Sequence, residues 1–289
     1  MKKFFTLMIA IFALSAAFTA CTKESEQDGY YNPKKKISEI VHNTKIEQHY
    51  GQTYRTITKE IWTWNGNQLT SIDFVTGDGV NHYRTALFRY DNKNRIAEME
   101  VVGLRTYIYD YKDDMINEIN YYDQNGDYLG KYEFKHNGNK LSEIIIQNPD
   151  ENTKEALFNP LRFFLPDNTT EMVINNASKG TTHYKFTWTG KNVSKLEISG
   201  AASTTNTISY KYDNKNNPFK SFYDLMDIAF ATICSANNAV QIVYHYENNR
   251  DETADYTYVY DEKYPVEKTR KYTQNGAQTT STIQYKYMD

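Results

Sequence analysis

A short aromatic motif recurs along most of this chain and constrains its fold more than any other feature. Each copy has two aromatic residues separated by one position, then a polar turn, then two apolar residues three positions apart. Recurrence of one pattern at intervals of about 25 residues is typical of a repeat architecture. The clearest copies are Trp62-Thr63-Trp64 with Leu69 and Ile72, Phe88-Arg89-Tyr90 with Ile96 and Met99, Tyr107-Ile108-Tyr109 with Ile116 and Ile119, Tyr132-Glu133-Phe134 with Leu141 and Ile144, and Phe186-Thr187-Trp188 with Val193 and Leu196; looser copies begin at Tyr210, Tyr244, Tyr258 and Tyr285.

The motif has a period of two, which is the period of a β-strand. In residues 131–135 the two rings point to one face and the charged side chains to the other, as in a half-buried antiparallel strand. Asn-Gly pairs at 65–66, 125–126, 137–138 and 275–276 supply the positive φ angles of tight turns. Each copy therefore predicts a hairpin, and the chain predicts about 12–16 strands. We expect an all-β fold, a long antiparallel meander of repeated hairpins that curls or closes into a barrel-like shape.

Two segments interrupt the meander. Residues 148–182 contain three prolines and many Asn and Thr residues, and we expect a long excursion there. The second segment opens at Asn217-Pro218, where asparagine as cap and proline at the first position are typical of a helix start. We expect one short helix over 218–232, packed on the sheet or plugging a barrel end. A helix on a membrane surface is less favoured, because its polar face carries only Lys220 as a base. The apolar residues at helical spacing are Phe219, Phe222, Tyr223, Met226, Phe230 and Ile233.

The N-terminus has the form of a bacterial lipoprotein signal. Lys2 and Lys3 precede an apolar run that ends at Phe18, and Thr19-Ala20-Cys21 follows. The run is shorter than the roughly twenty apolar residues that a transmembrane helix needs. We expect residues 1–20 to be removed, with Cys21 as the lipidated new N-terminus, 21–36 as a flexible tether and 37–289 as a single β-repeat domain. Resemblance to this class implies a diacylglyceryl thioether and an acylated amine on Cys21, which together hold a domain on a membrane.

The acidic stretch after Cys21 bears on the location of the domain. Residues 22–28 resemble the signal by which gut Bacteroidetes send lipoproteins to the outer face of the outer membrane, while a solvated linker explains them equally well. We expect a lipid-anchored protein of the outer membrane, exposed at the cell surface, with the membrane as its partner through Cys21.

Charge and cysteine content exclude two further classes. Without residues 1–20 the chain has 31 basic and 36 acidic residues, and this mild, interspersed balance argues against a nucleic-acid partner. With Cys21 lipidated, Cys234 is the remaining thiol, so no internal disulfide is possible. Its neighbours Ile233 and Ala236 favour a buried small residue over a nucleophile.

Motifs that carry chemistry are missing from the sequence. The six histidines are scattered without zinc-type spacing, and there is no nucleophile elbow or phosphate loop. Residues 123–127 begin like a calcium loop but lack the closing glutamate, so a hairpin turn is preferred. The adjacent acids Asp113-Asp114 and Asp251-Glu252 are interpreted as solvated turn residues. We therefore predict no catalytic, cofactor or metal site, and only Cys21 as a modified residue.

The lipoprotein signal, the tandem aromatic-x-Tyr-Asp hairpins and the Asn-Pro-Phe segment at 217–219 resemble uncharacterised Bacteroidetes lipoproteins described as having a porin-like fold. The hairpins also resemble the Tyr-Asp repeats of Rhs and teneurin shells, but the regular glycine of those repeats is missing. The resemblance implies a fold and specifies no chemistry.

The remaining expectation concerns function. We expect a non-catalytic binding or scaffolding module that uses an aromatic-lined face for a glycan, lipid or protein ligand, although the 26 tyrosines are also explained as core. The alternatives are an accessory subunit of an outer-membrane assembly or transport system and, less favoured, a glycan-active enzyme. A membrane-spanning barrel is disfavoured, because Lys131, Glu133 and Lys211 lie opposite the aromatic face and the mean hydropathy is −0.75.

Overall fold

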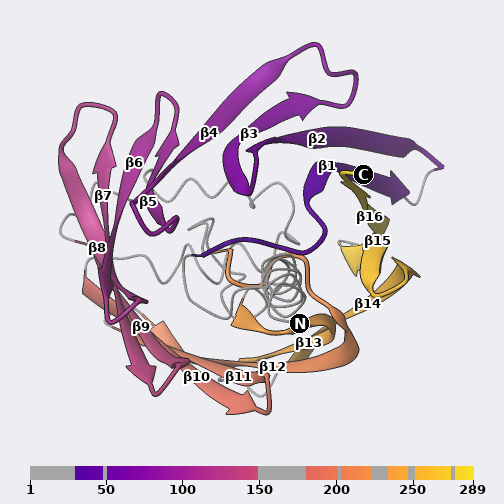
Figure 1. Cartoon of the computed structure of the whole chain (residues 1–289). Coiled ribbons are helices and arrows are strands. Elements are labelled where there is room, and N and C mark those ends of the chain that lie inside the picture. The colour runs from indigo at the N-terminus through magenta and orange to yellow at the C-terminus, as the bar shows by residue number, and fades with distance from the viewer. Residues whose placement is uncertain are drawn as a thin grey trace, which may run out of the picture.

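The computed structural model describes residues 30–47, 51–148, 180–200, 203–222, 234–246, 251–274 and 277–289. Within them, 16 antiparallel strands form one closed barrel, in which every strand pairs with its sequence neighbours and β1 pairs with β16 (Figure 1). The predicted all-β hairpin meander is confirmed, and it is closed. The strands are β1 (Ile37–Glu47), β2 (Thr53–Asn65), β3 (Gln68–Thr76), β4 (His82–Tyr90), β5 (Ile96–Val101), β6 (Arg105–Lys112), β7 (Met115–Asp123), β8 (Tyr128–Asn137), β9 (Lys140–Asn148), β10 (Gly180–Thr189), β11 (Asn192–Gly200), β12 (Ser203–Asn216), β13 (Asn237–His245), β14 (Asp251–Asp261), β15 (Tyr264–Gln274) and β16 (Ala277–Tyr287).

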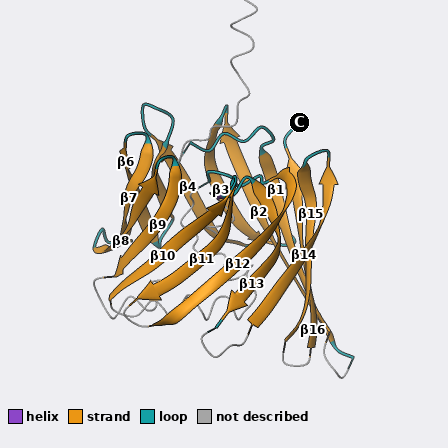
Figure 2. Cartoon of the chain, turned by 90° about the horizontal axis from the view of Figure 1, so that it is seen from below, coloured by secondary structure: helices purple, strands orange, loops and turns teal. Residues whose placement is uncertain are grey.

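The barrel has two distinct ends. The terminal end is the one at which β1 begins and β16 ends, and Figure 2 shows it at the top, beside the C-terminus. Tight turns close this end, and the predicted Asn-Gly positions Gly66 and Gly138 have φ angles of 57° and 62°. At the opposite end, Gly126 of the third predicted pair has a φ of 87°. The fourth pair, at 275–276, lies outside the described residues.

A β-bulge near the start of the odd-numbered strands explains the spacing of the two apolar residues. Three positions cannot share a face in a regular strand, yet Leu69 and Ile72 are both fully buried. An extra residue, Thr70, lies between them, so that the register shifts by one and both side chains point inward. The Thr70 hydroxyl donates to the Thr63 carbonyl oxygen at 3.0 Å. The corresponding extra residues of β5, β7, β9 and β11 are Ala97, Asn117, Ser142 and Ser194.

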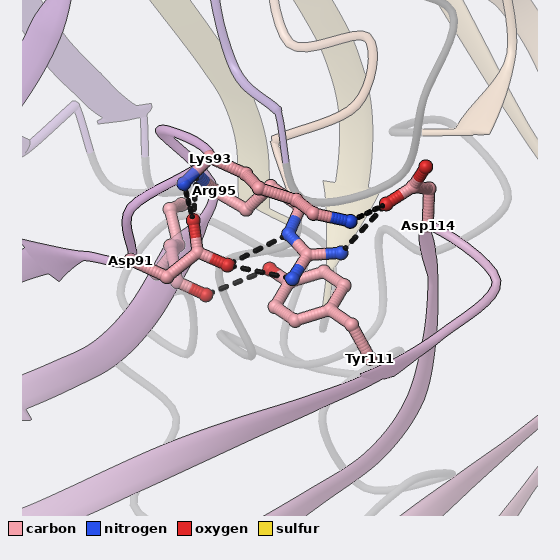
Figure 3. A network of polar contacts seen from close by, with 6 residues as sticks. Asp91, Lys93, Arg95, Tyr111 and Asp114 are labelled. Atoms are coloured by element: carbon pink, nitrogen blue, oxygen red, sulfur yellow. Dashed lines mark hydrogen bonds and ion pairs between the residues drawn. The ribbon is translucent and has the colours of Figure 1, made fainter.

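Aromatic side chains near the ends of even-numbered strands fasten them to the preceding strand. In Figure 3 the Tyr111 hydroxyl donates to the carbonyl oxygen of Ile96 at 2.7 Å, and the Arg95 guanidinium lies 4.0 Å from the Tyr111 ring centre. Asp91 and Asp114 hold Arg95 from its two sides. The recurring tyrosines and tryptophans thus fill the core with their rings and link neighbouring strands through their hydroxyl and indole groups. The equivalent bonds run from Trp64 to Ile37, Tyr90 to Leu69, Trp188 to Leu141, Tyr258 to Ala239 and Tyr287 to Pro265.

Residues 30–36 and residues 217–222 lie inside the ring of strands (Figure 1). The Phe222 ring centre is 4.5 Å from that of Tyr31, 5.2 Å from that of Trp62 and 5.8 Å from that of Phe88. Phe222 is 2% exposed. Phe222 and Tyr31 are therefore part of the barrel core.

The helix predicted over 218–232 does not begin at 218. Residues 218–221 form a turn in which Ser221 has a φ of 67°. The Phe222 amide donates to Phe219, while the Pro218 carbonyl, which a helix would offer to Phe222, accepts the Tyr31 hydroxyl at 2.8 Å. Packing inside the barrel thus overrides the local helix signal. Residues 223–232, and residues 149–179 of the predicted excursion, lie outside the described residues.

The outward face of the strands is charged. Lys131 pairs with Glu118 and Glu133 at 2.9 and 2.6 Å, and Arg89 pairs with Glu98 and Glu100. These side chains alternate with the buried residues of the same strands. In the described part of the chain, no helix is long and apolar enough to cross a membrane.

Candidate functional site

Most residues that the sequence analysis examined for chemistry have structural roles. The Asp123 carboxylate accepts the backbone amides of Asn125 and Asp127 at 2.8 and 2.9 Å, so the predicted hairpin turn is confirmed. These bonds hold the pKa of Asp123 below its usual value. Asp113 and Asp114 have positive φ angles in the β6–β7 turn, as predicted. Cys21 lies outside the described residues, so its lipidation stays a prediction.

The other acids and the histidines are dispersed. Asp251 and Glu252 begin β14, where Asp251 contacts His245 and Glu252 accepts the Tyr246 hydroxyl, so their assignment to a turn was wrong. Among the described residues, no three of the His, Cys, Asp and Glu side chains form a group that could hold a metal ion. Cys234 is buried, as predicted.

The repeats themselves reveal a site that the sequence analysis missed. Aligned by their bulges, six odd-numbered strands have a buried apolar or aromatic side chain at the second apolar position of the motif and another one two residues later. On β15 these two positions hold Lys268 and Arg270, since Tyr258 pairs with Lys268 as Trp62 pairs with Ile72. We call Lys268 and Arg270 the cationic patch. The equivalent pairs on β3, β5, β7, β9, β11 and β13 are Ile72 and Phe74, Met99 and Val101, Ile119 and Tyr121, Ile144 and Ile146, Leu196 and Ile198, and Ile242 and Tyr244, all buried.

Tyrosine rings flank the cationic patch. The Lys268 Nζ atom lies 4.1 Å from the centre of the Tyr256 ring. The Arg270 Cζ atom lies 4.5 Å from the Tyr272 ring centre and 5.9 Å from that of Tyr256. Such rings attract cations through their negative faces, which offsets part of the cost of taking the charges out of water.

The cationic patch has no anionic partner within the part of the chain that the structure describes. Neither Lys268 nor Arg270 forms an ion pair there, and the Nε and Nη1 atoms of Arg270 are buried without a hydrogen-bond partner. Glu267, on the same strand, pairs with Gln284 on the outward face. Burial and the neighbouring Arg270 charge lower the pKa of Lys268 to about 8. Two cations that have no anionic partner among the described residues therefore face the interior of the barrel.

A polar pair lies beside the cationic patch on the adjoining inner wall. On β1 the position two residues after the second apolar position is His42, which lies in one pairing row with Ile283 and Lys268. The His42 Nε2 atom is 2.7 Å from Glu60 Oε1, and the other Glu60 oxygen accepts the Trp62 indole at 3.0 Å. Glu60 is thus satisfied by His42 and Trp62. On β15, β1 and β2 these polar side chains interrupt an inner wall that is otherwise apolar and aromatic, as at Ile40, Trp62 and Tyr285.

The missed signal was present in the sequence. Lys268 and Arg270 follow Pro265 by three and five residues, as Ile72 and Phe74 follow Leu69. If the bulge is not taken into account, residues 267–271 read as a solvated strand, because all five are polar and none indicates which face points inward. With it, the two cations occupy core positions.

Comparison with known proteins supports the fold. No protein-family model matches the chain, and no curated protein matches it. The solved structure of a porin-like protein from Bacteroides uniformis matches 87% of this chain and 98% of its own, with a TM-score of 0.52 and 14% identity. A porin-like protein from Bacteroides vulgatus (TM-score 0.31, 9% identity, 88% of this chain and 99% of its own) and TcdB2-TccC3 (TM-score 0.35, 12% identity, 82% and 14%) also match. The Bacteroides uniformis structure, with its TM-score of 0.52, confirms the expected porin-like fold.

Proposed function

We propose that this chain is a non-catalytic binding module that a lipid on Cys21 holds at the outer membrane, with the barrel standing in water. The observation that carries the binding role is the cationic patch, which replaces core residues on one inner wall. A repeat with a purely structural purpose gains nothing from burying two uncompensated charges.

The outward charges support the lipid anchor over anchoring by strands. A membrane barrel presents an apolar outer band, and each Lys or Arg at mid-membrane costs about 2–4 kcal/mol. Lys131 and Arg89 belong to networks of such charges on the outward face. The acidic residues 22–28 support display at the cell surface.

Removing the lipid tests this function. We expect Cys21→Ser to leave the outer membrane and to be recovered as a folded soluble protein, because no strand face would hold it there. Cell fractionation with an antibody to the chain measures this, and Cys234→Ser is the matched control that stays with the membrane. A Cys21→Ser protein that remains in the membrane fraction would refute the anchor. Protease added to intact cells then distinguishes the two membrane faces, since cleavage of the wild type supports surface display.

A further inference from the structure

We propose that the cationic patch binds the carboxylate or phosphate group of a small anionic ligand inside the barrel. This inference deepens the proposed function, on which it rests, by naming the chemical class of the ligand.

The geometry of the two side chains suits an oxyanion. A guanidinium group offers parallel N–H donors that match the two oxygens of a carboxylate or phosphate, and an ammonium group adds a point charge beside it. Arg270 retains buried Nε and Nη1 donors without a partner. Lys268 and Arg270 lie two positions apart on β15, so both project to the same side of the strand.

The surroundings favour binding over a structural role. Two acids of the nearby strands β2 and β14 are engaged elsewhere, Glu60 with His42 and Trp62, and Glu252 with Tyr246. Burial and the neighbouring Arg270 charge lower the pKa of Lys268, as expected for an ammonium group beside another cation. A bound anion would supply the missing countercharge, and its attraction would be strong because the wall around it is aromatic and apolar.

The alignment of the repeats provides a variant that separates ligand binding from folding. Lys268→Ile restores the residue type found at the equivalent position of the other hairpins, namely Ile72, Ile119, Ile144 and Ile242. If the lysine serves a ligand, this variant should unfold at a higher temperature than the wild type and bind anions at least tenfold more weakly. If the lysine has a structural role, the variant should unfold at a lower temperature.

The experiment is calorimetric titration of the detergent-solubilised full chain with glucuronate, glucose 1-phosphate and, as a neutral probe, glucose. We expect saturable binding of one or both anions, no binding of glucose, and at least a tenfold loss in Lys268→Ile and in Arg270→Gln. The two anions distinguish a carboxylate ligand from a phosphate ligand. Lys271→Met is the matched control, since Lys271 carries the same charge on the exposed face of the same strand, and it should bind like the wild type.

Several results would overturn the inference. They are a wild type that binds neither anion, equal binding of glucose, or Lys268→Ile and Arg270→Gln proteins that bind as the wild type does. Each of these leaves the Cys21→Ser result intact, so failure of the anion site and failure of the lipid anchor are distinguishable.

Discussion

At the scale of single residues, the cationic patch makes stability depend on pH. The pKa of Lys268 is lowered to about 8 in the fold, whereas an unfolded lysine titrates near 10.4. Below about pH 8 both states bind the proton, and above that value the folded state releases it first. The unfolded state then binds more protons, so the free energy of unfolding rises with pH.

We predict a gain of about 1–2 kcal/mol between pH 8 and pH 9.5, since one pKa unit corresponds to about 1.4 kcal/mol. Urea unfolding of the wild type and of Lys268→Met, compared at both pH values, measures it. The rise should be lost in Lys268→Met. Parallel profiles in the two proteins would contradict the assignment. This rise in stability ends near pH 10. Burial raises the pKa of Tyr256 and Tyr210 in the fold, so tyrosines of the unfolded chain ionise first, and a further increase in pH favours unfolding.

At the scale of the strands, the bulge sets which face of the sheet each side chain occupies. Ser142 is the extra residue of β9, and its hydroxyl donates to the Lys135 carbonyl at 2.9 Å. Leu141 and Ile144, on either side of it, are buried. A one-residue change of register moves one set of side chains to the opposite face.

We predict that deleting Ser142 prevents folding or costs more than about 3 kcal/mol, because it turns Leu141 or Ile144 out of the core. Ser142→Ala, which loses only the hydroxyl bond, should cost about 0.5–1.5 kcal/mol. Urea unfolding followed by tryptophan fluorescence compares the two variants. Similar costs for both would show that the bulge does not set the register.

Hairpins, the helix start and the bulge differ in how far the sequence predicted them. The period of two and the turns at Gly66 and Gly138 were sufficient for hairpins, because each is a local signal. The start of the helix at Pro218 was predicted wrongly, because the competing bond from Tyr31 comes from a residue far away in the sequence. The cationic patch was missed because its inward orientation depends on a bulge. The spacing of three between Leu69 and Ile72 is the sequence trace of this bulge, but the spacing alone does not indicate that both side chains point inward.

At the scale of the whole molecule, closure of β1 on β16 leaves no free sheet edge and separates two environments. The inner wall carries the apolar core, which includes Phe222, and the cationic patch. The outward wall carries ion pairs, which individually contribute little to stability but make the surface hydrophilic. The fold is porin-like, and our proposals are that the barrel stands in water and binds its ligand inside.

Thiol labelling of the barrel wall in isolated outer membranes tests this claim most directly. Single cysteines replace Ile108 and Val259, which are 39% and 55% exposed on the outward face, and the fully buried Ile119, each in a Cys234→Ser background. If the barrel stands in water, a charged, lipid-insoluble maleimide should label positions 108 and 259 rapidly and position 119 only after unfolding. Protection of positions 108 and 259 in the membrane, with rapid labelling after detergent extraction of the folded protein, would mean that lipid covers the strands and would contradict the account.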